Sequence, residues 1–190
     1  MARFEMSRDD LTKRLEELGR RLEGKGLTGR ILLTGGAAMC LVHESRAMTQ
    51  DIDALFEPRD EIAAITSEMA LEYGWPENWF NDSVGGFIGA DPPRAFFKRF
   101  PGLEVFAVSP EYLLAMKLAA SRLIENSGRD MDDIHFLGRK LGYTAPGQFY
   151  ETYERYFKKE DLPRDAHFII SEFFNSDPSE EYLKRPNRGS

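Results

Sequence analysis

Cysteine, histidine and long apolar runs are scarce in this chain of 190 residues. Its single cysteine, Cys40, excludes an intramolecular disulfide framework and favours a reducing, cytoplasmic setting. The simplest interpretation of Cys40 is a small buried residue rather than a reactive thiol. No apolar run approaches the roughly 18 residues of a membrane span, and the start of the chain has no signal-peptide core. We therefore expect no membrane segment.

Positive charge is also in deficit. The chain has 25 Lys and Arg residues against 32 Asp and Glu residues, and its formal net charge is −7. This balance argues against broad electrostatic binding of nucleic acid, although it leaves a local basic groove open. Hydrophobic residues make up 42% of the chain, which is ordinary for a globular protein. A chain of this length buries about 70% of its unfolded surface in one domain.

Residues 30–56 organise the rest of the chain. Residues 31–33 form a short apolar run with β-branched character, and Gly35 and Gly36 end it. Residues 37–43 contain no helix breaker, and residues 54–56 form a second apolar run. The predicted order is therefore strand, glycine turn, short helix, loop and strand.

The alternation Asp51-Ile52-Asp53 opens the second of these strands. Residues two apart on a strand point to the same face, so both carboxylates project together while Ile52 turns into the core. Like charges so close repel unless a cation lies between them, and hard oxygen ligands suit Mg²⁺, which shares its shell with phosphates. Gly35 and Gly36 let backbone N–H groups approach a ligand closely, and the helix start after them favours an anion. These residues together predict a nucleotide–metal site.

The segment Thr34-Gly35-Gly36, followed by Thr49-x-Asp51-x-Asp53, resembles the signature of the polymerase-β-like nucleotidyltransferase fold. Within that fold the chain is most similar to the AbiEii-like, toxin-type nucleotidyltransferases of bacteria and archaea, over about residues 28–140. The resemblance implies an α/β (α+β) protein with a small mixed sheet, flanking helices and a nucleoside triphosphate such as ATP as substrate. It also implies a set of site residues: Thr34, Gly35, Gly36 and Thr49 would bind the nucleotide, and Asp51 and Asp53 would hold one or two Mg²⁺ ions.

Glu104 and Lys117 complete the site that the resemblance implies. Residues 103–108 read as a strand, where a carboxylate is costly to bury unless it is paired or metal-bound. By resemblance Glu104 is the third metal ligand, and the alternative is a glutamate of an edge strand in water. Lys117 lies among apolar residues in a predicted helix, and by resemblance it steadies the triphosphate as part of the catalytic set. Its alternative is a surface lysine that snorkels.

The remaining elements are mostly helical. Ser7-x-x-Asp10 predicts the cap of an amphipathic helix, and further helices are predicted at residues 59–73, 111–125, 146–159 and 164–174. The Arg129-Asp130 pair, with Asp133, starts another helix that we interpret as a structural brace. We expect a catalytic domain at residues 1–142, a helical extension packed on it at residues 143–175, and a flexible tail at residues 176–190.

A Mg²⁺-dependent transferase is the function that these residues favour. It would move a nucleoside monophosphate from a triphosphate to an acceptor such as RNA, including a transfer RNA end, or a protein hydroxyl. Arg94, Lys98 and Arg99 form a basic cluster that could contact an acidic acceptor. The alternative is a catalytically inactive, nucleotide-binding regulatory protein that acts through a partner. A toxin role, with an antitoxin protein as partner, is implied by the resemblance alone.

Overall fold

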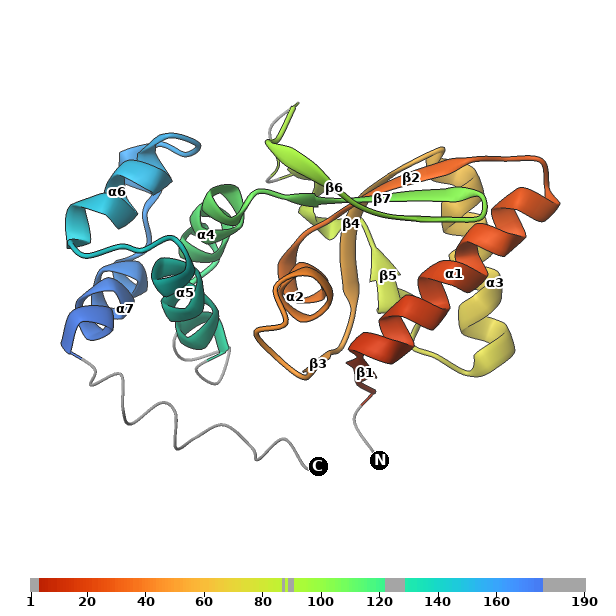
Figure 1. The fold of residues 1–190 in the computed structure, drawn as a ribbon, viewed down its shortest axis with the longest axis horizontal. Coiled ribbons are helices and arrows are strands. Elements are labelled where there is room, and N and C mark those ends of the chain that lie inside the picture. The colour runs from red at the N-terminus through yellow and green to blue at the C-terminus, as the bar shows by residue number, and fades with distance from the viewer. Residues whose placement is uncertain (1–3, 87, 89–90, 122–128, 176–190) are drawn as a thin grey trace.

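The computed structural model describes residues 4–86, 88, 91–121 and 129–175. Its centre is a five-stranded mixed sheet of order β5-β4-β2-β7-β6, and β1 pairs separately with β3 (Figure 1). The strands are β1 Met6–Ser7, β2 Gly29–Leu33, β3 Met48–Thr49, β4 Ile52–Glu57, β5 Phe80–Asn81, β6 Arg94–Phe100 and β7 Leu103–Val108. A mixed sheet flanked by helices confirms the predicted α/β fold class.

Strand β2 lies at the middle of the sheet. It runs antiparallel to β4 and parallel to β7, so that Leu33 faces Ala54 on one side and Ala107 on the other. Strand β5 runs parallel to β4, and β6 runs antiparallel to β7. Because residues at one level of neighbouring strands share a face, this register fixes which side chains of the sheet meet.

Helices α1 (Arg8–Gly24) and α3 (Arg59–Tyr73) cover one face of the sheet (Figure 1). Helix α1 begins with a capping box, in which the Ser7 hydroxyl accepts from the Asp10 N–H and the Asp10 carboxylate accepts from the Ser7 N–H. The apolar stripe of the helix is fully buried: Leu11, Leu15, Leu18 and Leu22. Each such side chain contributes about 1.5–3 kcal/mol on burial, which makes packing rather than propensity the main anchor of α1.

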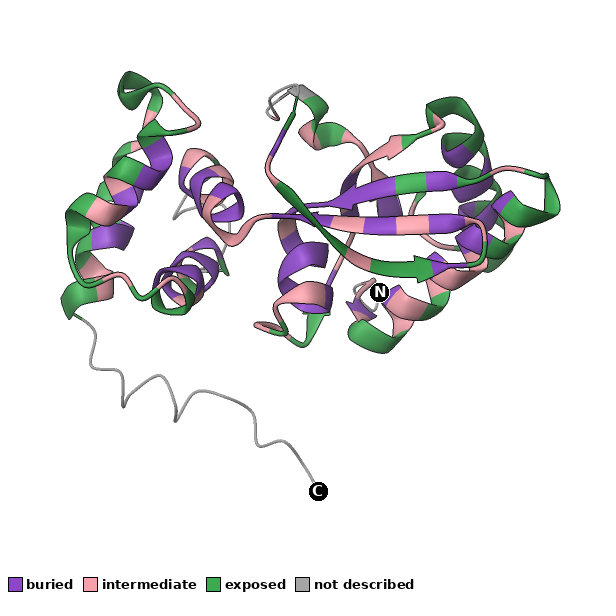
Figure 2. Ribbon diagram, turned by 45° about the horizontal axis from the view of Figure 1, so that its top comes forward, coloured by how far each residue is buried: buried purple, intermediate pink, exposed green. Residues whose placement is uncertain are grey.

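The opposite face of the sheet, called here the second face, carries the alternate residues of the strands. Asp53 and Leu55 of β4 lie on it, together with Leu32 of β2 and Phe106 of β7. Edge strand β6 is exposed over most of its length (Figure 2), and its Phe96 is 56% exposed. The second face is therefore accessible at its β6 side.

Helices α4 (Pro110–Ala119), α5 (Arg129–Lys140), α6 (Pro146–Glu154) and α7 (Arg164–Asn175) pack on one another beside the sheet (Figure 1). Helix α4 follows β7 directly, and the Ser109 hydroxyl caps it by accepting from the Tyr112 N–H. It also contacts α2 (Gly35–Ala37), the short helix at the glycine turn. The helical group thus lies against the predicted site.

Some boundaries differ from those predicted. Helix α4 ends at Ala119 and α6 at Glu154, both earlier than expected, and residues 94–100 form β6, a strand that the sequence did not indicate. Residues 122–125 of the predicted helix and the predicted tail at 176–190 lie outside the described residues. Within the described part of the chain, no helix is both long enough and apolar enough to span a bilayer.

Candidate nucleotide and metal site

Strand β4 and the end of β2 place the two aspartates. Ile52 is fully buried, whereas Asp51 and Asp53 on either side of it are half-buried, as the alternation predicts. The N–H and the hydroxyl of Thr34 both donate to the Asp53 carbonyl oxygen, at 3.0 and 3.1 Å. The Thr49 hydroxyl donates to the Asp51 carbonyl oxygen at 3.3 Å. Both threonines are buried, and each hydroxyl donates to the backbone of an aspartate of the site.

The glycine pair lies directly against residues of the site: Gly35 against Asp53, and Gly36 against Thr49 and Arg46. Gly35 has a φ of +51°, in the left-handed region, and a Cβ added there would lie 2.7 Å from Asp53 Oδ2. A Cβ added at Gly36 would lie 2.4 Å from Thr49 Oγ1 and 3.4 Å from Arg46 Nη1. The sequence therefore needs glycine at both positions because a side chain would collide with the residues that build the site.

The Asp51 carboxyl lies between opposing electrostatic influences. Burial raises its pKa, and the neighbouring Asp53 carboxylate raises it further, whereas Arg46 and Lys117 lower it. Two half-buried carboxylates with such a coupling gain from an added cation. The structure thus brings together Asp51, Asp53 and the glycine pair, with Arg46 and Lys117 close enough to act electrostatically on Asp51.

Lys117 belongs to a buried ion cluster between α4 and α5. Its Nζ lies 3.2 Å from Asp130 Oδ1 and 2.8 Å from Asp133 Oδ2, and its side chain is 14% exposed. The Arg46 guanidinium forms a second ion pair with Asp133. Snorkelling does not describe Lys117, since its charge is paired inside the protein. Asp130 and Asp133 are buried, as a structural brace requires. They also form ion pairs with Lys117 and Arg46, so they do more than join helices.

Glu104 lies elsewhere. In the strand register Glu104 of β7 pairs with Arg30 of β2, and Arg30 pairs in turn with Glu57 of β4. Glu57 lies four residues after Asp53, so Glu104 lies roughly 13 Å along the strands from the level of Asp53. It forms ion pairs with Arg99 and Arg30, and these hold its pKa below the ordinary value for a glutamate. The structure does not bring Glu104 together with Asp51 and Asp53, so the expected third metal ligand does not fit this placement.

Two carboxylates can still hold a divalent ion when a substrate completes its shell. Among the described residues, no group of three His, Cys, Asp or Glu side chains is placed to bind a metal. Mg²⁺, however, is commonly held by one or two carboxylates together with substrate phosphates and water. The half-buried pair, with the backbone of Gly35 directly against the Asp53 carboxylate, matches that kind of site.

Sequence reasoning missed two contacts of the site. Ser83 lies near Asp53, with its Oγ 3.4 Å from Asp53 Oδ1, and nothing in its local sequence singles it out. Asp133 lies three residues after Asp130 on α5, a spacing that puts both carboxylates on one face of a helix. That spacing could have suggested that both carboxylates pair with one basic side chain. Which basic side chain it is, here Lys117, depends on the fold.

No protein-family model matches the chain, and no curated protein matches it. Among solved structures, the chain resembles the crystal structure of an antigenic nucleotidyltransferase-like protein from Paracoccidioides brasiliensis. The TM-score is 0.46 and the sequence identity is 17%, over 94% of this chain and 93% of that chain. A likeness at this level decides neither the family nor the activity, which have to be argued from the site itself.

Proposed function

We propose that this protein is a Mg²⁺-dependent nucleotidyltransferase that moves a nucleoside monophosphate from a triphosphate to an acceptor. The observation that carries the proposal is the placement of Asp51 and Asp53 beside a glycine pair that leaves no side chain in the way. Arg46 and Lys117 add positive charge on the side of α4 and α5. Such a site accepts both a divalent cation and the phosphates that share it.

Each residue then has a separate task. Asp51 and Asp53 would hold the cation, and Gly35 and Gly36 would allow phosphate oxygens to approach the backbone. Lys117 stays paired with Asp130 and Asp133 and would act on the triphosphate through its positive charge. The cation that these two aspartates would hold would supply Lewis-acid chemistry at the α-phosphate and would offset the charge of the attacking hydroxyl and of the leaving pyrophosphate. The raised pKa of Asp51 describes the protein without a cation, and a bound cation reverses that effect by favouring the carboxylate.

The test uses purified protein, Mg²⁺ and each α-labelled nucleoside triphosphate in turn, with cell lysate as acceptor separated into RNA and protein fractions. Asp51→Asn should lose about 3 kcal/mol of transition-state stabilisation, a fall of roughly 150-fold in rate. Asp9→Asn is the matched control because Asp9 is a solvent-exposed aspartate of α1 that pairs with Lys13. Equal labelling by the wild type and by Asp51→Asn would refute the proposal.

A nucleotide-binding protein without transferase activity is the second candidate. The placement of Glu104 favours it, since the site then has two carboxylates rather than the three that the resemblance implies. This candidate predicts that the protein binds triphosphate in a manner that depends on Asp53 but releases no pyrophosphate. Label in either fraction that is absent from the Asp51→Asn reaction would exclude it.

The AbiEii-like part of the resemblance supports a biological role that we also propose: the toxin of a toxin–antitoxin pair, acting in the cytoplasm and neutralised by an antitoxin protein. Its motif support is Thr34-Gly35-Gly36 with Asp51 and Asp53. Expression in the native host should arrest growth, and Asp53→Asn should relieve the arrest. Normal growth during expression of the soluble wild-type protein would count against this role.

A further inference from the structure

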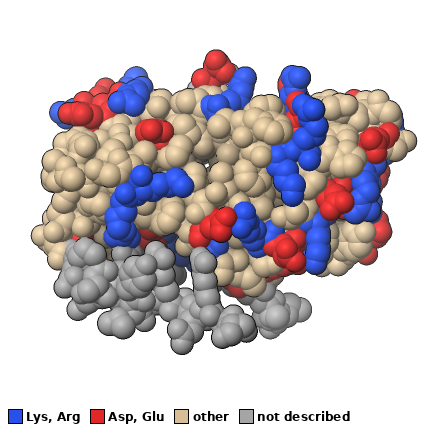
Figure 3. Space-filling view, viewed as in Figure 1, with Lys and Arg blue, Asp and Glu red and all other residues tan. Residues whose placement is uncertain are grey.

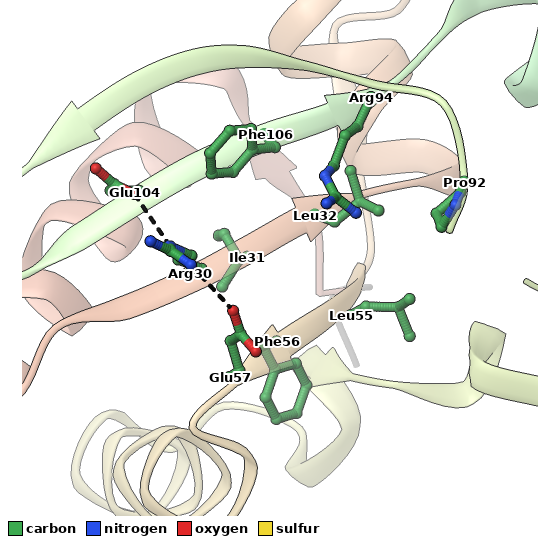
Figure 4. Close-up of a pocket in the computed structure, with 10 residues that line it drawn as sticks. All are labelled: Arg30, Ile31, Leu32, Leu55, Phe56, Glu57, Pro92, Arg94, Glu104 and Phe106. Carbon is green, nitrogen blue, oxygen red and sulfur yellow. Dashed lines mark hydrogen bonds and ion pairs between the residues drawn. The ribbon is translucent and has the colours of Figure 1, made fainter. Parts of the chain in front are cut away.

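The register of the sheet sorts residues of the second face into two rows that run across four strands. One row is charged, with alternating signs, and runs from β6 through β7 and β2 to β4: Arg99, Glu104, Arg30 and Glu57. The neighbouring row is apolar and follows the same strands: Phe96, Phe106, Leu32 and Leu55. Residues of both rows line a hollow of about 400 Å³ (Figure 4). The face thus presents an apolar band beside a band of alternating charge.

Ion pairs within the chain join the charged row. The Arg99 guanidinium lies 2.5 Å from the Glu104 carboxylate. The Arg30 guanidinium lies 3.2 Å from Glu104 and 3.6 Å from Glu57 (Figure 4). The side chains of Arg99 and Glu57, at the two ends of the row, are each 71% exposed. Because an exposed ion pair holds its partners only weakly, both end charges can also pair with another molecule.

A break in the register of β6 brings an exposed aromatic ring onto the same face. Phe96 and Arg99 are three residues apart, so a regular strand would turn them to opposite faces. The register shift between Phe96 and Lys98 puts both on the second face, where the rings of Phe96 and Phe106 meet edge to face with centroids 5.7 Å apart. Phe96 is 56% exposed, so the apolar row ends in a ring that the chain covers only in part. Contiguous exposed apolar surface of this kind marks a protein interaction site.

We propose that the second face is an interface between two copies of this chain, related by a two-fold axis that runs along the strands between β7 and β2. This axis lays β6 of one copy over β4 of the other, and β7 over β2. Arg99 then faces Glu57 of the second copy, and Glu104 faces Arg30 of the second copy. The inference goes beyond the proposed function, since it needs neither nucleotide nor metal.

The order of the charges selects this arrangement. A row of alternating signs over an even number of strands becomes complementary to itself when it is reversed, so each charge meets one of opposite sign. A two-fold axis across the strands at the charged row would instead set each charge against its own copy. In the apolar row the chosen axis places the rings of Phe96 and Phe106 against the smaller side chains of Leu55 and Leu32. It also keeps the strand directions of the two sheets aligned, as in sheets that pack face to face about 10 Å apart.

The size of the face limits the affinity. Two rows of four residues are fewer than the roughly 20–30 residues a side of a stable interface, so we expect a dissociation constant of about 10–100 µM. The net charge of −7 on each copy opposes association, although positive and negative side chains are interleaved on the face viewed in Figure 3. Salt near 150 mM shortens the range of that repulsion to about 8 Å, so the test is made at this concentration.

The experiment is sedimentation equilibrium of the full chain over about 5–500 µM, a range that brackets the expected dissociation constant. The weight-average mass of the wild type should rise toward twice that of the monomer as the concentration increases. Phe96→Ser should weaken association about tenfold or more. Phe168→Ser is the matched control, because Phe168 is 52% exposed on α7, in the helical group. It should associate as the wild type does.

Two charge reversals test the position of the two-fold axis. Arg99→Glu sets two carboxylates against each other at both ends of the charged row, and Glu57→Arg sets two guanidinium groups against each other there. Each variant alone should therefore associate at least about tenfold more weakly than the wild type. An equimolar mixture of the two should associate nearly as the wild type does, because every end charge then meets one of opposite sign. Both positions are exposed, so thermal melting should show that both variants are folded.

The outcomes decide the interface independently of the transfer assays. Wild-type protein that stays monomeric over the whole range refutes the second copy as the partner of this face. Equal association of Phe96→Ser and Phe168→Ser would show that the dimer uses another surface. Charge variants that each associate as the wild type does, or that stay apart when mixed, would refute the two-fold axis. Association that is lost in each charge variant and returns on mixing supports the interface.

Discussion

Replacing Gly35 with alanine should lower activity far more than its effect on the stability of the fold would explain. At a φ of +51° an alanine costs about 1–2 kcal/mol, which lowers the melting temperature of a chain this size by about 2–8 °C. The new Cβ would also lie 2.7 Å from Asp53 Oδ2, so the carboxylate has to move. A displacement near 1 Å at a catalytic group costs about 100-fold in rate. We therefore expect Gly35→Ala to lose about 100-fold in kcat/KM.

Gly74 provides the control for this experiment. Its φ is +65°, so alanine there meets the same backbone strain, yet nothing lies within 4 Å of the added Cβ. Gly74→Ala should lower the melting temperature by a similar amount and leave kcat/KM unchanged. The assays are thermal melting and transfer of α-labelled nucleotide. Full activity in Gly35→Ala, or an equal loss in Gly74→Ala, would refute the claim that Gly35 makes room beside Asp53.

Further predictions concern charge. Asp133→Asn leaves Lys117 short of a buried partner and should cost about 3 kcal/mol, or about 6–12 °C in melting temperature; a change under 1 °C would contradict the ion cluster. The pKa of Asp51 is raised in the fold, so its ionisation makes folding less favourable once the pH has risen through that pKa. Asp51→Asn should therefore have a higher melting temperature than the wild type at pH 7 without Mg²⁺, and a lower one would contradict this reasoning. Burial lowers the pKa of His43 to about 4, so the free energy of unfolding should fall as the pH drops from about 6.5 toward 4. His43→Gln should lose less stability over the same pH range, and an equal loss would exclude His43 as the cause. Glu104→Gln should leave the Mg²⁺ concentration for half-maximal activity unchanged, whereas a large increase would restore Glu104 as a ligand.

The predictions that held depend on short-range patterns. The apolar stripe and the capping box of α1 lie within a single helix, so period and spacing were enough to predict them. The same is true of Asp51 and Asp53, whose common direction follows from strand alternation around Ile52. The glycine turn also follows from neighbouring residues, although the atoms that require Gly35 come from β4.

The features that the sequence did not predict depend on register and tertiary contacts. Alternation sets Glu104 opposite to Leu103 and Val105, but the pairing of β7 with β2 decides where Glu104 lies relative to Asp53, and local sequence does not contain that pairing. Strand β6 lacks clean alternation because its register shifts between Phe96 and Lys98. The partners of Lys117 come from α5, which the chain reaches only after α4 has ended.

Binding of Mn²⁺, followed by its electron paramagnetic resonance signal in the presence of a non-hydrolysable triphosphate analogue, tests the metal site most directly. Free Mn²⁺ should decrease on titration with wild-type protein and stay at the level of the analogue alone with the Asp51→Asn/Asp53→Asn variant. Asp9→Asn should behave as the wild type. Equal binding by the double variant and the wild type would show that the metal lies elsewhere, and would contradict the site proposed here.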